Sequence, residues 1–381
     1  MEKNLYIFAL EFLNSRTGEL AIGGVQTYVH NLSSLAQEKG YSVTIFQMKS
    51  VKNVNCIYNG AKVIICNVKE SHMQKYFDTA YEKCNTPGAL FIIATDQIPI
   101  KTDKLNVISI QHGIAFDIPG YSIHGFWGKN RFLQHVNKLL RCIKNVNRCY
   151  QVPNTVCVDY NYYNWFRTIG TIYKNKRVKV IPNYSSDCIS ENEIVEKLIS
   201  KSNVKKILFA RRFCDYRGTL LFSNVIIRIL NKYSNLEVTF AGNGPLEDYV
   251  KELFARYDNV KITHFATVNS ISVHKHYDIA VVPTIYSEGT SLSLIEAMSS
   301  GCFPLATHVG GMTNIILDNY NGILCSPDEE SLYKSLVRIL EMEDADFNRI
   351  VTNAYYSAKQ SFSINNWKEK WSDYIDEVVS L

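Results

Sequence analysis

Hydrophobic and polar positions change period along the chain, from short apolar runs to helical spacing and back. The first apolar run, 4–10, is followed by a polar loop and by apolar residues at intervals of three and four over 25–36. That spacing is typical of a helix with one buried face, and the next run, 42–46, again has the length of a strand. Strand, loop, helix and strand in this order predict a parallel α/β unit of the Rossmann type.

The same alternation of strand-like and helix-like segments continues toward the end of the chain. Further strands are expected at 62–66, 89–94, 106–110, 178–181, 206–210, 237–241, 279–283 and 304–307. Pro182, Asn183 and the small polar residues after them interrupt the pattern, which is typical of a domain boundary. We therefore expect two α/β domains and a last helix with aromatic residues at helical spacing, over 1–183, 184–361 and 362–381.

The composition is that of an ordinary globular protein. Of 381 residues, 46% are hydrophobic and 20% charged, and this length favours two cores. No apolar run approaches the roughly 20 residues of a membrane span and the start does not resemble a signal peptide, so a cytoplasmic protein is expected. The net charge of +5 does not indicate a nucleic-acid partner. The ten cysteines form no C-x-x-C pair and no histidine cluster has zinc spacing, so no metal site is expected.

The segment after the strand at 279–283 has the clearest chemical pattern. Two carboxylates, Glu288 and Glu296, enclose a turn and the start of a helix. The residues after the first carboxylate are Gly289, Thr290, Ser291 and Leu292. Free N–H groups and the positive end of a helix dipole suit a phosphate at such a turn. Carboxylates on both sides of a phosphate site indicate a nucleotide sugar as ligand.

A purely structural interpretation of the second carboxylate is equally open on this segment alone. Ser293 and Glu296 have the spacing of a capping box, in which the glutamate bonds only a backbone N–H at the helix start.

Two loops of the second domain have residues that suit a nucleotide. Arg212 and Arg217 follow its first strand, and guanidinium groups at that spacing can converge on a diphosphate. The alternative is that both are ordinary surface arginines. Gly242 and Gly244 follow the strand at 237–241, where such a pattern by itself often marks only a turn.

The first domain contributes two candidate loops. Gly23 and Gly24 precede a helix, where glycines let a ligand approach the backbone or simply form a tight turn. His112 and Asp117 follow the strand at 106–110, at the sheet edge where open α/β folds bind ligands. A lone histidine there can also be structural.

These segments resemble, in chain order, the motifs of retaining glycosyltransferases of the GT-B fold, family 4. The matching residues are Gly23 with Gly24, His112 with Gly113, Pro182 with Asn183, Arg212 with Arg217, Gly242 with Gly244, and Glu288 with Glu296 in the spacing E-x7-E. The resemblance implies two Rossmann-like domains facing across a cleft, with the last helix crossing back onto the N-terminal domain. It implies a hexosyltransferase that acts with retention at the anomeric carbon.

The resemblance also implies a role for each segment. Glu288 would contact the donor sugar, Glu296 the ribose hydroxyls, and the arginines with the amides of 289–292 the diphosphate. His112 would lie beside the donor sugar as a second catalytic residue. Further donor or acceptor contacts fall to Gly23, Gly24, Asp117, Gly242, Gly244 and Pro283. Arg211 replaces the family's usual glycine and Asn314 its usual glutamate, and neither is assigned a role.

The expected reaction moves a sugar from a UDP- or GDP-sugar to a glycan or lipid-linked acceptor, in surface polysaccharide synthesis, without metal or other cofactor. Two other functions stay open: a sugar-nucleotide epimerase or phosphorylase on the same fold, and a non-catalytic partner of a true transferase.

A basic segment at 129–150 leaves the membrane question open. Its residues include Lys129, Arg131, Lys138, Arg141, Lys144 and Arg148, interleaved with Leu139, Leu140, Ile143 and Val146. The pattern predicts an amphipathic helix. Either its apolar stripe belongs to the core and its basic face is merely solvated, or the helix meets a lipid-linked acceptor or the membrane from the cytoplasmic side.

Overall fold

The computed structural model describes residues 3–14, 16–21, 23–50, 54–113, 130–169, 176–200, 204–264 and 270–381. The chain divides into two compact units. Unit 1 contains Met1–Phe116, Ile123–Pro182 and Trp367–Leu381, and unit 2 contains chiefly Asn183–Asn366. Asp117, one of the predicted site residues, lies outside the described residues.

Unit 1 is built on an eight-stranded sheet in the order β3-β4-β2-β1-β5-β6-β7-β8. Its strands are β1 (Lys3–Ala9), β2 (Tyr41–Gln47), β3 (Val54–Tyr58), β4 (Ala61–Ile65), β5 (Leu90–Ile93), β6 (Val107–Gln111), β7 (Asn154–Cys157) and β8 (Arg177–Val180). All neighbours pair in parallel except β3 with β4. Central strands such as β5 are buried along their whole length, which explains their unbroken apolar sequence.

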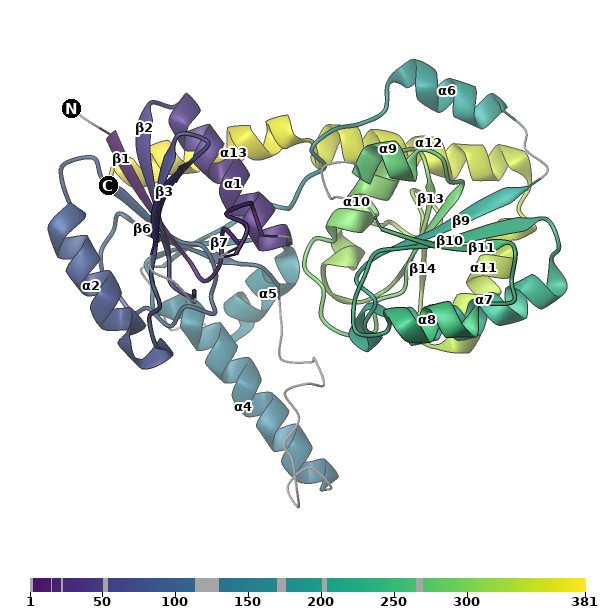
Figure 1. Ribbon diagram of the computed structural model, residues 1–381, viewed down its shortest axis with the longest axis horizontal. Coiled ribbons are helices and arrows are strands. Elements are labelled where there is room, and N and C mark those ends of the chain that lie inside the picture. Colours follow the sequence, from purple (N-terminus) through teal and green to yellow (C-terminus); the bar gives the residue numbers. More distant parts are fainter. Residues whose placement is uncertain are drawn as a thin grey trace. The chain divides into compact units, whose positions relative to one another are not determined.

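Helices cover the sheet of unit 1. They are α1 (Gly24–Glu38), the short 3-10 helix η1 (Glu70–His72), α2 (Met73–Cys84), α4 (Arg131–Tyr150), α5 (Tyr160–Ile169) and most of α13 (Ile364–Val379). In Figure 1 the yellow helix α13 lies beside the purple α1. Trp371 Nε1 donates to the Tyr28 hydroxyl at 2.7 Å, and the ring of Trp367 meets the Tyr28 ring edge-on. The aromatic stripe of the last helix therefore packs on unit 1.

Unit 2 has a six-stranded parallel sheet in the order β11-β10-β9-β12-β13-β14. Its strands are β9 (Lys205–Ala210), β10 (Leu236–Ala241), β11 (Val260–Thr263), β12 (Ile279–Val282), β13 (Phe303–Thr307) and β14 (Ile323–Cys325). Counted within the unit, this is the Rossmann order 3-2-1-4-5-6. The strand order reverses between β9 and β12, so the loops that follow these two strands open a crevice where such sheets bind ligands.

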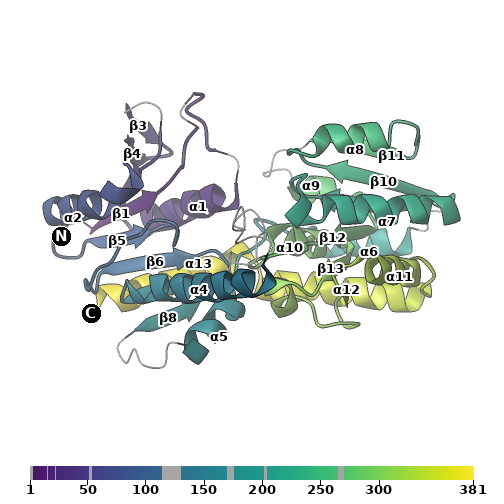
Figure 2. The ribbon, with the colours of Figure 1, turned by 90° about the horizontal axis from the view of Figure 1, so that it is seen from below.

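The helices of unit 2 lie on both faces of that sheet. Figure 1 shows α7, α8 and α11 on one face and α9, α10 and α12 on the other, and Figure 2 shows the same sheet from below. The elements are α6 (Glu191–Ile199), η3 (Asp215–Arg217), α7 (Thr219–Lys232), α8 (Glu247–Leu253), α9 (Ser270–His274), α10 (Leu292–Ser299), η5 (Gly310–Asn314), α11 (Glu329–Leu340) and α12 (Asp344–Ser361). Apolar side chains from both layers bury the sheet, among them Phe209, Phe222 and Leu336 beneath α7 and α11.

The predicted α/β class and the Rossmann-like arrangement are confirmed, and every strand expected from an apolar run is present. The apolar pattern did not predict β3, β7 and β11. Strands β3 and β11 lie at sheet edges, where one side needs no apolar cover, and β7 carries the polar pair Asn154 and Thr155 within the sheet. The described helices include none long and apolar enough to cross a membrane.

Candidate functional site

Two loops meet at the point of strand reversal in unit 2. The first follows β9 and contains Arg211 and the turn η3, and the second follows β12 and leads into α10. Because β9 and β12 are parallel neighbours, their carboxyl ends bring these loops to the same edge of the sheet.

A cluster of charges joins these two loops. Arg211 and Arg217 both donate to the Oε2 atom of Glu288, and the Thr284 hydroxyl donates to the same oxygen at 3.2 Å. The side chains of Arg211 and Glu288 are only 5% and 11% exposed, whereas that of Arg217 is 27% exposed. Two guanidinium groups around one carboxylate leave a net positive charge in a mostly buried place.

The cluster fixes the protonation state of Glu288. Burial alone would raise the pKa of this carboxyl, but Arg217 and Arg211 lower it to about 2. The same Glu288 charge raises the pKa of Arg217 against the effect of burial, and desolvation lowers the pKa of Arg211. Glu288 is therefore a carboxylate at any working pH and cannot serve as a proton donor.

The structure changes which arginine belongs to the cluster. Arg211, which the sequence left without a role, contacts Glu288, whereas the predicted Arg212 has an exposed side chain. Consecutive residues leaving a strand point to opposite sides, so only one of the two can turn toward Glu288. The other terminal nitrogen of Arg211, Nη1, is buried and has no hydrogen-bond partner among the described residues.

The start of α10 is open toward this cluster. Ser291 is the N-cap, and in the described structure its hydroxyl accepts no hydrogen bond from a backbone N–H of the helix. Helix α10 begins at Leu292, so Ser293 is its second residue and the capping box with Glu296 does not form. The turn itself is held in place because Asn183 Nδ2 donates to the Thr290 carbonyl at 2.7 Å.

Gly311 explains how closely the chain packs behind this turn. A Cβ on Gly311 would lie 2.6 Å from the Gly289 carbonyl carbon and oxygen, and its N–H donates to the Glu288 carbonyl at 2.9 Å. The turn between β12 and α10 is therefore backed by η5, and its amides keep a fixed direction.

Glu296 lies one turn into α10 with a different set of neighbours. The Ser270 hydroxyl donates to Glu296 Oε2 at 2.6 Å, and burial raises the pKa of Glu296 to about 7. His274 Nδ1 lies 2.8 Å from the Ser270 carbonyl and 3.2 Å from its hydroxyl, so the imidazole N–H holds Ser270. Sequence reasoning missed Ser270 and His274, which come from a short helix with no recognisable motif.

The glycines of the loop after β10 have a packing role. Gly242 and Gly244 have φ of +152° and +153°, and a Cβ on them would lie 2.0 Å from the Arg211 carbonyl and 2.5 Å from the Phe213 carbonyl. Both glycines thus let this loop press against the arginine loop. Pro283 is buried, and its carbonyl lies where a Cβ on Gly218 would be.

In unit 1, His112 is the predicted site residue with the clearest environment. It follows β6, and its Nε2 lies 2.8 Å from the Ala94 carbonyl, so Nε2 is the protonated nitrogen. Burial lowers the pKa of His112 to about 4. The edge of the Tyr28 ring also packs against the imidazole. Gly23 and Gly24 form the start of α1, where Gly23 is the N-cap.

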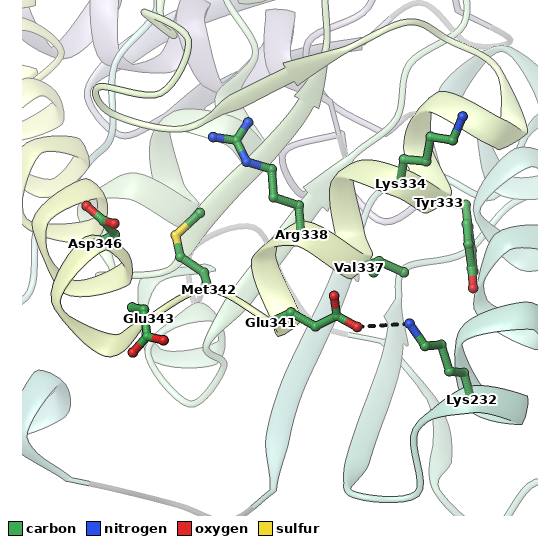
Figure 3. Close-up of a pocket in the computed structure, with 9 residues that line it drawn as sticks. All are labelled: Lys232, Tyr333, Lys334, Val337, Arg338, Glu341, Met342, Glu343 and Asp346. Carbon is green, nitrogen blue, oxygen red and sulfur yellow. Dashed lines mark hydrogen bonds and ion pairs between the residues drawn. The ribbon is translucent and has the colours of Figure 1, made fainter.

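A separate pocket of unit 2 does not match this chemistry. Figure 3 shows it between α7, α11 and the start of α12, where Lys232 and Glu341 form an ion pair at 2.9 Å. It measures about 490 Å³, and its wall carries three basic and three acidic side chains. It lies where α7 ends, at the opposite end of the sheet from the loops after β9 and β12, and its balanced charges favour no anion.

The comparisons with known proteins agree with this geometry. A family model described as Glycosyl transferases group 1 matches residues 190–356, which lie within unit 2. A human phosphatidylinositol N-acetylglucosaminyltransferase is 23% identical over 375 residues, covering 94% of this chain and 74% of the human protein.

A second relative and a solved structure extend the similarity. A Campylobacter jejuni α-1,4-N-acetyl-D-galactosaminyltransferase, named for a diNAcBac-PP-undecaprenol substrate, is 28% identical over 230 residues, or 58% of this chain and 62% of that protein. The crystal structure of Anabaena Alr3699/HepE in complex with UDP superposes with a TM-score of 0.68 at 15% identity, covering 98% of this chain and all of that one.

Proposed function

The chain is a glycosyltransferase of the GT-B fold whose unit 2 belongs to the glycosyl transferases group 1 family, and we propose that it transfers a hexose from a UDP- or GDP-sugar with retention at the anomeric carbon. The donor site of this proposal is the crevice between the loops after β9 and β12. Family 4 of the GT-B enzymes is the class that its motifs match.

One observation carries the proposal of a diphosphate site. The buried Nη1 of Arg211 lacks an acceptor among the described residues, and the uncapped start of α10 lies directly after the Glu288 that Arg211 binds. A buried guanidinium nitrogen without a partner is unfavourable, and free amides at a helix start attract an anion. A diphosphate would satisfy both at once. The charge that builds up on the departing diphosphate would be stabilised by the same preorganised positive groups.

The bonding of Glu288 suggests its part in the reaction. Arg211, Arg217 and Thr284 all bond Oε2, and we assign the other oxygen, Oε1, to a hydroxyl of the donor sugar. A carboxylate whose charge is shared with two arginines is a weak nucleophile. This favours a reaction on one face of the sugar, without a covalent glycosyl-enzyme, and a role for Glu288 in placing the sugar.

Glu296 is the proposed ribose ligand. Ser270 bonds its Oε2, and its carboxyl lies one turn beyond the helix start that we assign to the diphosphate. Arg212, exposed beside the cluster, would add a third guanidinium to the diphosphate. His112 is proposed to lie beside the donor sugar as a neutral group, and no metal is assigned a step.

The acceptor proposal rests on the names of the relatives. One is named for phosphatidylinositol and the other for an undecaprenol diphosphate substrate, both of which are lipids. We therefore propose a lipid-linked glycan as acceptor, in surface polysaccharide synthesis, and a cytoplasmic enzyme that meets the membrane from its surface.

The test is a screen of the purified chain against UDP-, GDP-, dTDP- and ADP-sugars, with EDTA present. Thermal stability and release of free nucleotide are measured without acceptor. We expect stabilisation by a UDP- or GDP-sugar with slow nucleotide release. Activity that needs added phosphate would instead identify a phosphorylase, and interconversion of the sugar without an acceptor an epimerase. Absence of any shift with every donor would overturn the donor site and favour a non-catalytic partner.

A further inference from the structure

Helix α4 of unit 1 exposes large apolar side chains along one face. Phe132 is 72% exposed, Leu139 57% and Leu140 59%, while Val136 and Ile143 are 37% and 38% exposed. We call these five residues the α4 stripe. They include five of the 17 large apolar side chains that are this exposed among the described residues, all within 12 consecutive positions. Scattered exposed apolar residues are ordinary, but a contiguous group indicates a contact surface.

Helical geometry places the α4 stripe on a single side. Steps of four, three, one and three residues, at about 100° per residue, keep all five within a sector roughly 100° wide. Cys142, which is buried, lies outside this sector and marks the side by which the helix meets the rest of unit 1. The expectation that the apolar residues of this helix belong to the core is therefore wrong for the stripe.

The remaining positions of α4 have charges of one sign only. The helix contains Arg131, Lys138, Arg141, Lys144 and Arg148, and no aspartate or glutamate. Lys138, near the middle, is exposed. A helix with an apolar stripe on one side and basic residues at its other positions is typical of segments that lie in the interface of a bilayer with anionic lipids.

We infer that the α4 stripe enters the interface of an anionic membrane while basic residues of α4, Lys138 among them, meet lipid headgroups. A second copy of the chain fits the same face less well, because it would bring a second helix with five basic residues and no acidic one against the first. Anionic lipid supplies both the apolar phase and the opposite charge. The inference rests on the proposed function only in that a lipid-linked acceptor gives the contact a purpose, since membrane binding itself needs no substrate.

Flotation of the full-length chain with lipid vesicles tests the inference. One set of vesicles is phosphatidylcholine alone, and the other is equal parts of phosphatidylcholine and phosphatidylglycerol. The chain is expected to float with the second set and to remain in solution with the first. The double variant Phe132→Ser/Leu139→Ser is expected to lose roughly a hundredfold in partitioning, because two apolar side chains no longer leave water. Lys138→Glu is expected to reduce it by about tenfold.

Matched controls separate the stripe from general effects. Leu317→Ser removes a leucine of unit 2 that is 64% exposed, and Lys370→Glu reverses an exposed lysine on α13, and both should float as the unchanged chain does. Failure of the chain to float with anionic vesicles, or equal flotation of the double variant, would overturn the inference. So would self-association in solution that the double variant abolishes, which would assign the stripe to a second copy.

A donor assay without vesicles keeps this inference distinct from the proposed function. The stripe lies in unit 1, outside the proposed donor crevice of unit 2, so the double variant should release nucleotide from UDP-glucose as fast as the unchanged chain. Lost flotation with retained release supports the membrane face alone, whereas lost release in both proteins would count against the donor site.

Discussion

Arg211 and Glu288 lie 77 residues apart in the chain and form a buried ion pair at the point where the sheet of unit 2 reverses its strand order. The pair joins the loop after β9 to the loop after β12. Because Arg217 binds the same oxygen, removal of the carboxylate would leave two guanidinium groups close together without compensation. The pair therefore links the stability of unit 2 to the charge that we assign to donor binding.

Glu288→Gln should destabilise unit 2 when no ligand is present. Loss of the carboxylate from a buried pair costs about 3 kcal/mol, since the remaining charges stay buried. Denaturant unfolding measures this change. The matched control is Glu330→Gln, which breaks an exposed pair with Arg228 and should change the free energy of unfolding by less than about 1 kcal/mol. Equal effects of the two substitutions would show that the cluster does not support the fold.

Arg212→Ala should abolish detectable turnover and leave the fold intact. Its side chain is exposed, so its removal opens no cavity, whereas the proposed diphosphate loses one charge-assisted contact. The measurements are nucleotide release and the melting temperature. Arg256→Ala, at an exposed position on the same unit, serves as the control and should keep both. Near-normal turnover of Arg212→Ala would remove this residue from the donor site.

Donor affinity should depend on pH through Glu296. Its pKa of about 7 means that the free protein carries a neutral carboxyl below that value, and a neutral carboxyl accepts ribose hydroxyls more weakly. Affinity is therefore expected to rise with pH and to level off above about 7. Calorimetry with UDP-glucose measures it, because this donor has no phosphate proton that titrates near neutrality.

Two variants test whether Glu296 is the titrating group. Glu296→Gln should bind weakly with a flat pH profile. Ser270→Ala should move the profile to higher pH, because the Ser270 hydroxyl lowers the pKa of Glu296. The control Ser223→Ala, at a buried serine on α7, should leave the midpoint unchanged. A pH-dependent profile that persists in Glu296→Gln would assign the titration to another group.

Unit 1 should lose stability when the link between α1 and the last helix is cut. Trp371→Phe removes the 2.7 Å hydrogen bond to the Tyr28 hydroxyl and leaves that hydroxyl buried, at a cost of about 1–3 kcal/mol. Tyr28→Phe should cost a similar amount. The double variant should cost less than the sum, because both substitutions remove the same bond. Strictly additive losses would mean that the bond contributes nothing.

His112 should make unit 1 sensitive to acid. Its pKa in the folded chain is about 4, below the ordinary value of 6.5, so unfolding lets it take up a proton. Stability is then fully present above pH 6.5 and falls as the pH drops toward about 4. His112→Gln should lose less stability than the unchanged chain over this interval, whereas His264→Gln, at a histidine that is 54% exposed, should behave like the unchanged chain. Melting temperatures against pH decide between them.

Local patterns predicted the elements of this protein well. Apolar runs located β1, β9 and β12, because a strand buried on both faces has no polar alternation. Glycines and small polar residues located the turn before α10. Edge strands such as β11 escaped, since their half-exposed sequence, Val260–Thr263, resembles a loop.

The sequence by itself determined which segments become strands and helices, and it brought two carboxylates and several arginines to the ends of particular strands. Only the tertiary structure decided that Arg211 rather than Arg212 meets Glu288, because the direction of a side chain leaving β9 depends on the register of its sheet. It also decided that Ser270 bonds Glu296 and that the α4 stripe is exposed. Periodicity gives the faces of an element, and packing alone decides what each face meets.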